Sequence, residues 1–159
     1  MRVTTSSRTD IRIRKLEVEI IVQFLWFSKL KIKVFRSKNL HVVQYLLNNN
    51  VQTDNRKFYD SPLHTAAEND SYEIAELLLK HNSMLVNALR GENTRLTALH
   101  IAAEHGYPAT VDVLLRYNAK VSLKCSRGFT ALHYAAKSSC EQVIDLILKQ
   151  VIDIQFEIF

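Results

Sequence analysis

The stretch that decides the fold is TALHIAAEHG at residues 97–106, because it returns as TALHYAAKSS at residues 130–139. The two copies begin 33 residues apart. A looser copy, SPLHTAA at residues 61–67, begins 36 residues upstream of the first, so about three residues are inserted, and we expect them near residues 85–93. One structural unit is therefore expected to recur along the chain.

Each copy predicts a short helix followed by a second one. Thr97 is suited to cap the first helix, and Leu99, Ala102 and Ala103 then recur at the spacing of one helical face. Alanines on that face let another helix approach closely. Gly106 is free to adopt a positive φ and is expected to end the helix. Five residues later, at Val111, a second apolar run begins and predicts the partner helix.

Asparagine follows the second apolar run in three units, at Asn50, Asn82 and Asn118. Asn tolerates the left-handed conformation at a helix end better than most residues other than glycine, so all three are expected to adopt it. A turn then leads to the next unit. Its glycine is Gly128 in the last copy but is replaced by Tyr59 and Arg95 in the first two.

The 33-residue period, the hydroxyl-Pro/Ala-Leu-His core and the leucine runs resemble the ankyrin repeat. The resemblance implies an all-α solenoid of paired short antiparallel helices, joined by turns and β-hairpin-like tips. It covers residues 36–150, divided into a partial repeat at 36–54 and repeats at about 55–90, 91–123 and 124–150.

The two ends depart from this pattern. Residues 1–35 contain a strand-like alternation at residues 11–14, and a helical stripe from Leu16 to Phe27 that we prefer as a capping helix. Residues 28–36, where a first helix is expected, are either a degenerate unit or no repeat. Residues 151–159 form an apolar tail, although a terminal repeat normally has a polar outer face. We therefore expect the chain to be a fragment of a longer array.

Composition and charge indicate the class of protein and its cellular compartment. The 159 residues are 47% hydrophobic and 23% charged, as in an ordinary globular protein. The net charge of +5 is the sum of +7 in residues 1–40 and −2 in residues 41–159. With two cysteines and no predicted signal peptide or transmembrane segment, we expect an intracellular, cytoplasmic protein.

Three histidines, His64, His100 and His133, invite a metal or acid–base interpretation. They occupy the same face of successive helices about 10 Å apart, whereas zinc ligands must converge to within about 2.1 Å of the ion. The ankyrin resemblance implies instead that each imidazole hydrogen-bonds backbone in the turn between units. Glu68 and Glu104, one unit apart, are expected to be a solvated pair.

No nucleophile or phosphate-binding motif is present, so we expect neither catalysis nor a cofactor. Lys124 and Arg127 lie near Cys125 and would lower the pKa of its thiol, and Cys140 begins a helix. We interpret both cysteines as ordinary thiols.

The resemblance implies partner binding through the turn tips and the exposed end of each first helix, which form a concave face. Apolar tip residues form either a stripe that anchors a partner or contacts with the adjacent turn; they are Phe58, Leu96 and Phe129. The other tip candidates are Lys57, Asp60, Asn93, Thr94, Ser126 and Arg127. The helix candidates are Glu68, Asn69, Glu104, His105, Lys137 and Ser138.

Non-catalytic protein–protein recognition is the function that follows, with no small-molecule substrate. The alternative is a structural repeat segment of a larger channel, membrane-skeleton adaptor or enzyme-linked targeting protein. A third hypothesis gives the basic residues 1–40 a role at anionic membranes or on nucleic acid.

Overall fold

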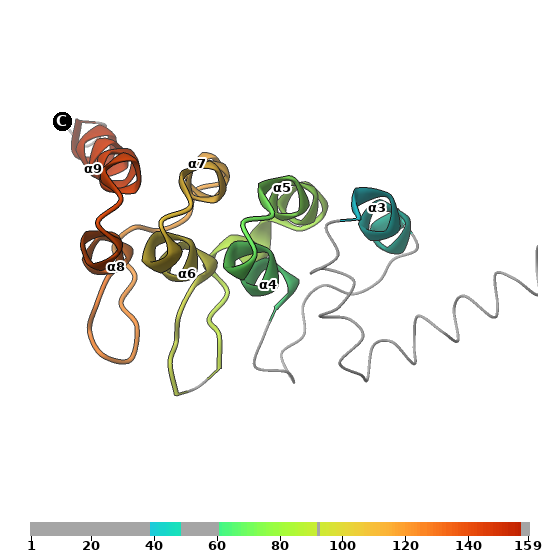
Figure 1. The fold of residues 1–159 in the computed structure, drawn as a ribbon, viewed down its shortest axis with the longest axis horizontal. Helices are drawn as coiled ribbons and strands as arrows, with labels where there is room; N and C mark the ends of the chain where they lie inside the picture. The colour runs from blue at the N-terminus through green and yellow to red at the C-terminus, as the bar shows by residue number, and fades with distance from the viewer. Residues whose placement is uncertain (1–38, 49–60, 92, 157–159) are drawn as a thin grey trace, which may run out of the picture.

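The computed structural model describes residues 39–48, 61–91 and 93–156, and arranges them as two rows of short helices (Figure 1). The inner row consists of α4 (Pro62–Glu68), α6 (Ala98–His105) and α8 (Ala131–Ser138). The outer row consists of α3 (Leu40–Asn48), α5 (Tyr72–His81), α7 (Pro108–Arg116) and α9 (Glu141–Phe156). The expected all-α ankyrin-type solenoid is confirmed.

Loops project from the end of the inner row away from the outer helices (Figure 1). The loop after α5 begins with a 3-10 helix, η1 (Ser83–Asn87). An isolated antiparallel bridge between Arg90 and Leu96 then closes a hairpin. The predicted capping helix and the tip residues Lys57, Phe58, Tyr59 and Asp60 lie outside the described residues, as does Asn50.

Helix ends follow local chemistry. Pro62 and Pro108 occupy the first turns of α4 and α7, where a missing backbone N–H removes no helical hydrogen bond. The ends of the inner helices use one repeat position, which carries Asp70, Gly106 and Ser139 with φ of 48°, 69° and 56°. The prediction for Gly106 is confirmed, and two non-glycine residues adopt the same left-handed backbone.

The asparagine prediction holds at one position and fails at another. Asn118 has a φ of 62°, as expected. Asn82 is extended, with a φ of −148°, because its side chain has another role: Asn82 Oδ1 accepts a hydrogen bond from Met84 N at 3.1 Å and caps η1. A residue that caps a helix start needs extended backbone, so Asn82 cannot also be left-handed.

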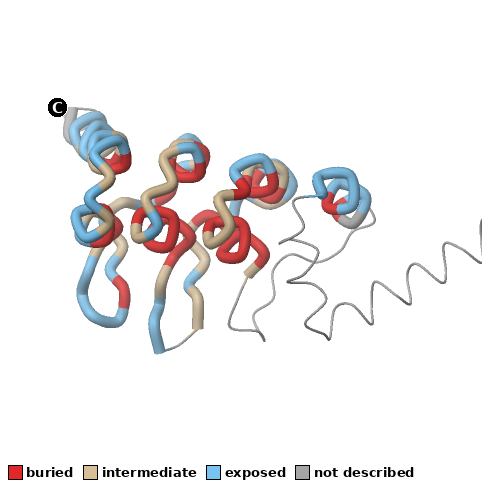
Figure 2. The backbone as a smooth tube through the Cα atoms, viewed as in Figure 1, coloured by how far each residue is buried: buried red, intermediate tan, exposed pale blue. Residues whose placement is uncertain are grey.

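The core runs between the two rows and through the inner helices (Figure 2). Small residues such as Ala66, Ala102 and Ala135 are completely buried, which allows α4, α6 and α8 to stack closely. Leu99 on an inner helix and Leu114 on an outer helix are also at most 1% exposed. Burying each leucine contributes about 1.5–3 kcal/mol, so a single unit depends on its neighbours for most of its stability.

The last helix is longer than the others. The repeat boundary predicted at residue 150 falls inside α9, which continues to Phe156. Ile152 and Ile154 are half exposed on its final turns. Among the described helices, α9 included, none has both the length and the apolar character needed to cross a membrane.

Candidate functional site

The described hairpin tips and the neighbouring ends of the inner helices lie on one side of the array (Figure 1). In the second hairpin Asn93 and Thr94 are exposed. In the third hairpin, which the bond from Cys125 N to Phe129 O closes at 2.9 Å, Ser126, Arg127 and Phe129 are exposed, and Figure 2 shows this loop as mostly solvent-accessible. These tip candidates are therefore available for contact.

The hairpins are held to one another through backbone atoms. Ser126 N donates to Thr94 O at 3.0 Å. Arg95 and Gly128, at the equivalent turn position, have φ of 51° and 80°. The second tip thus keeps the conformation of a glycine turn although arginine occupies it.

Asn87 provides a second link that the sequence did not reveal. Its side chain donates to Asn118 O at 3.4 Å and accepts from Lys120 N at 2.9 Å. Asn87 lies in the stretch that contains the inserted residues and has no unique counterpart in the next unit, so comparison of the copies offers no signal for this role.

The repeated histidines are part of the scaffold. The backbone N–H groups of Ser61, Thr97 and Thr130 donate to Nδ1 of the histidine three residues later, at 3.1–3.2 Å. A backbone N–H can only donate, so Nδ1 is the acceptor and the proton is on Nε2. No group of three or more potential metal ligands occurs within the described parts of the chain.

On two of these histidines, Nε2 reaches the following unit. His64 Nε2 donates to Ala88 O and Leu96 O at 3.2 and 3.1 Å, and His100 Nε2 donates to Phe129 O at 3.2 Å. The implied bond to the turn between units is confirmed for both. Burial lowers the pKa of His100, and its carbonyl hydrogen bonds offset this only in part.

His133 differs because no described unit follows it. Its imidazole is exposed and stacks on Phe129, with ring centroids 5.5 Å apart. Its Nε2 has no hydrogen bond to any described residue, and so remains a free donor beside the third hairpin.

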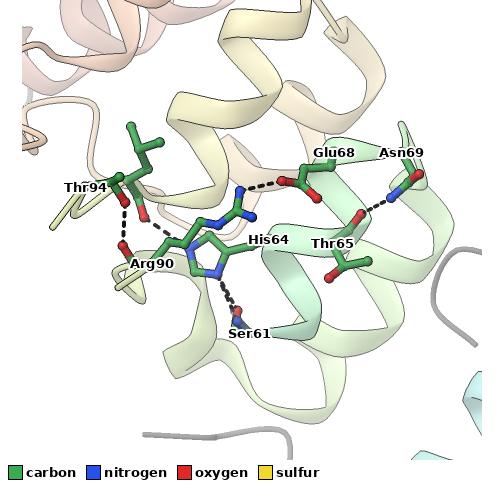
Figure 3. Close-up of polar contacts among 8 residues, drawn as sticks. Ser61, His64, Thr65, Glu68, Asn69, Arg90 and Thr94 are labelled. Atoms are coloured by element: carbon green, nitrogen blue, oxygen red, sulfur yellow. Dashed lines mark hydrogen bonds and ion pairs between the residues drawn. The ribbon is translucent and has the colours of Figure 1, made fainter. Parts of the chain in front are cut away.

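The two glutamates among the candidates each form an ion pair with a basic side chain. Glu68 forms an ion pair with Arg90 from the second hairpin, as Figure 3 shows. Glu104 pairs with Lys137 at 3.0 Å. The expectation that Glu68 and Glu104 form a solvated pair with each other is therefore wrong. Each is instead a link between its own inner helix and the next unit.

The remaining helix candidates make local contacts. Asn69 Nδ2 donates to Thr65 O at 2.7 Å (Figure 3), and Ser138 Oγ donates to Ala135 O at 2.9 Å. The exposed His105 ring stacks on Tyr107 at 5.4 Å. Of these three candidates, His105 presents the most accessible side chain.

The residues of the predicted apolar stripe that the structure describes differ in exposure. Phe129 is 44% exposed, whereas Leu96 is partly buried and packs against the core. Phe58, the third member, is outside the described residues. Phe129 therefore has the exposure that a partner anchor requires, whereas Leu96 packs against the core.

A cluster around Tyr134 was not predicted from the sequence. Arg127 Nη2 donates to the Tyr134 hydroxyl at 2.8 Å, and its guanidinium lies 5.6 Å from the Phe129 ring centroid. Tyr134 replaces Ile101 of the preceding unit, so the change from an aliphatic to a phenolic side chain is the available signal.

Cys125 is buried beside this cluster. Burial raises the pKa of its thiol, but hydrogen bonds from Tyr134 and from nearby backbone outweigh that effect, so the pKa is lowered. Its Sγ is 3.5 Å from the Tyr134 hydroxyl oxygen. Cys140 is partly buried, and neither cysteine is in a disulfide. Burial limits access to Cys125, which favours an ordinary structural thiol.

Comparison with known proteins identifies the repeat. The family model described as "Ankyrin repeats (3 copies)" matches residues 30–125 and 83–157. The chain belongs to the ankyrin repeat family. An ankyrin repeat-containing protein of Arabidopsis thaliana is 32% identical over 102 residues, which are 61% of this chain and 20% of that protein.

Two other relatives place ankyrin repeats within larger proteins. Palmitoyltransferase AKR1 of Lachancea kluyveri is 33% identical over 125 residues, 76% of this chain and 17% of its own length. The human transient receptor potential cation channel subfamily A member 1 is 36% identical over 108 residues, 67% of this chain and 10% of the channel. The ankyrin chain therefore spans a fifth or less of each of these three relatives.

Proposed function

We propose that this ankyrin array is a non-catalytic module that binds a partner protein through its concave face. The observation that carries the proposal is that backbone atoms and side chains have different roles in the hairpins. Backbone atoms, such as Ser126 N and Thr94 O, tie the loops together, while the side chains of Asn93, Arg127 and Phe129 extend into solvent. Those side chains are free to contact a partner.

The face is also preorganised. Glu68 with Arg90 and Glu104 with Lys137 fix helix to hairpin and helix to helix before any partner arrives. Because these elements are already ordered, association costs little conformational entropy. A rigid face of this kind suits recognition of one folded surface or extended segment.

Capture experiments test the proposal. Wild-type chain, a concave-face variant (Asn93→Ala, His105→Ala, Phe129→Ala) and an outer-face variant (Tyr72→Ala, Lys80→Ala, Met84→Ala) would be immobilised and compared by quantitative mass spectrometry. The outer-face residues are likewise exposed, so they form a matched control. A partner retained by wild type and the control but lost by the concave-face variant supports the proposal. Equal capture by all three contradicts it.

A second function rests on the relatives. The channel and the palmitoyltransferase each contain the matching repeats as a small part of their length. We propose as the alternative that the array is a structural segment of a larger channel, adaptor or enzyme-linked targeting protein. Full-length transcript sequencing would test this: an open reading frame confined to the 159 residues contradicts it.

A reducing compartment suits either function. Cys125 and Cys140 are free thiols, and such thiols persist in the cytoplasm. Fractionation of cells expressing the tagged chain would test a cytoplasmic location, and recovery from the secreted fraction would contradict it.

A further inference from the structure

Charge is segregated along the array. Residues 113–140 contain five lysines and arginines and no acidic residue, whereas residues 61–112 contain three basic and seven acidic residues. The cationic stretch comprises the end of α7, the third hairpin and α8. This concentration lies at one end of an otherwise acidic repeat region.

The array neutralises only part of this charge. Arg116 pairs with Asp112 at 2.9 Å, and Lys137 pairs with Glu104 at 3.0 Å. Lys120, Lys124 and Arg127 form no ion pair with any residue in the described ranges, and all three are exposed. The uncompensated cations therefore lie in the loop between α7 and α8, which includes the third hairpin.

One of these cations is held in place beside apolar surface. Arg127 donates to the Tyr134 hydroxyl at 2.8 Å, and its guanidinium lies 5.6 Å from the Phe129 ring centroid and 5.8 Å from that of Tyr134. Arginine and aromatic side chains are the residues most often found as interface anchors. The pair is positioned before binding, which reduces the entropy lost on association.

The surface continues from the hairpin along α8. Phe129 stacks on His133 at 5.5 Å, and Lys137 follows His133 one helical turn later. His133 contributes a free Nε2–H donor, because Nδ1 accepts from Thr130 N. We call Arg127, Phe129, His133 and Lys137 the α8 strip. It places the Arg127 guanidinium and the His133 Nε2–H beside the exposed Phe129 ring, and Lys137, which is already paired with Glu104, lies at its end.

We propose that the α8 strip binds an acidic segment of a partner protein, in which carboxylates flank an apolar side chain. The proposal rests on the proposed function and names the partner's chemistry. Carboxylates accept paired hydrogen bonds from the Arg127 guanidinium and a further bond from His133, while the apolar side chain packs on Phe129. The acidic residues elsewhere in the array steer such a segment to this end.

A short acidic segment fits better than nucleic acid. A nucleic acid gains affinity by many phosphate contacts along its length. Beyond the strip, a polyanion meets Glu141 and Asp145, both exposed on α9, and the acidic units on the other side. Repulsion at both ends limits the favourable contact to a few charges.

Fluorescence anisotropy tests the proposal at low and at physiological salt. The probe is a fluorescein-labelled peptide of sequence Glu-Asp-Glu-Phe-Glu-Asp-Glu, and its control has Gln and Asn in place of Glu and Asp. We expect the acidic peptide to bind roughly tenfold more tightly than its amide control, with the difference reduced by salt. In an amide NMR titration, the largest shifts are expected along the α8 strip.

Two variants with the same charge change locate the site. Arg127→Glu should weaken binding of the acidic peptide about tenfold, whereas Lys149→Glu, on the exposed side of α9, should change it less than about twofold. Phe129→Ala should weaken binding without altering its salt dependence. Circular dichroism melts would establish that every variant is folded.

Three results would overturn the proposal: equal binding of the two peptides, equal losses from Arg127→Glu and Lys149→Glu, or tighter binding of a single-stranded DNA oligonucleotide than of the acidic peptide. The capture experiment separates this failure from failure of the proposed function. If the peptide fails while capture still depends on Asn93, His105 and Phe129, the concave face binds a partner of different chemistry.

Discussion

The units formed by α6–α7 and by α8–α9 have nearly the same pattern but different surroundings. In the first unit Leu99, His100 and Ala103 are at most 1% exposed, because α8 covers them. The equivalents in the last unit, Leu132, His133 and Ala136, are partly or fully exposed. In the outer row, Leu115 is 7% exposed and its equivalent Leu148 is 40% exposed. A repeat position therefore becomes core only when a neighbour stacks on it.

The largest expected difference is between two leucine truncations. Leu99→Ala should lower the free energy of unfolding by about 3 kcal/mol, because it leaves a cavity between stacked helices. Leu132→Ala should cost about 1 kcal/mol, because its site is already partly open to water. Urea denaturation followed by circular dichroism measures both. Equal losses would show that the last unit is as well packed as the one before it.

The histidines give the next largest effect. His100→Ala removes the acceptor for Thr97 N and the donor to Phe129 O inside the array, and should cost about 2 kcal/mol. His133→Ala removes only exposed contacts, with Thr130 and with the Phe129 ring, and should cost less than about 1 kcal/mol. The same denaturation measurement applies, and a larger loss at His133 would contradict the assignment of a bridging role to His100.

The pH dependence of stability gives a further test of the role of His100. Burial lowers the pKa of His100 below its unfolded value of about 6.5, so the unfolded chain binds the proton more readily. Stability from the neutral imidazole is therefore complete above that value and is lost as pH falls towards the folded pKa. Wild type should lose more stability than His100→Gln between pH 7.5 and 5.5. Parallel losses would contradict this prediction.

The smallest effect concerns the two hairpins. Arg95 has the left-handed φ of 51° that suits glycine, so Arg95→Gly should raise the free energy of unfolding by about 1 kcal/mol. Gly128→Ala should lower it by about as much through backbone strain, since nothing lies within 4 Å of an added Cβ. Arg95→Ala serves as the control for loss of the side chain alone. Stabilisation by Arg95→Ala equal to that of Arg95→Gly would show that strain is not the cause.

The repeat spacing predicted the scaffold well because the same short-range forces act in each copy. Thr97, the paired alanines and Gly106 have the roles expected of a cap, a stacking face and a helix end. The histidine bonds to the turns followed from the family resemblance. The roles of residues that differ between copies were harder to predict, since a single sequence gives no second example of such a residue for comparison.

The failures arose where an insertion or a substitution created new partners. Asn82 caps a 3-10 helix in the longer loop, and Arg90 in the same loop binds Glu68. The site candidates were located by their repeat positions, but position alone could not separate the exposed Phe129 from the packed Leu96. Exposure depends on which neighbour is present, and that information lies in the fold.

The bond from Ser126 N to Thr94 O has an evolutionary consequence. Both atoms belong to the main chain, so any residue other than proline at position 126 preserves the link. Mutations at the tips can therefore accumulate without changing the spacing of the hairpins. Such an array can acquire a new binding specificity by changes at tip positions such as 126, while loop residues with a structural contact, such as Asn87 and Arg90, stay constrained along with the helices.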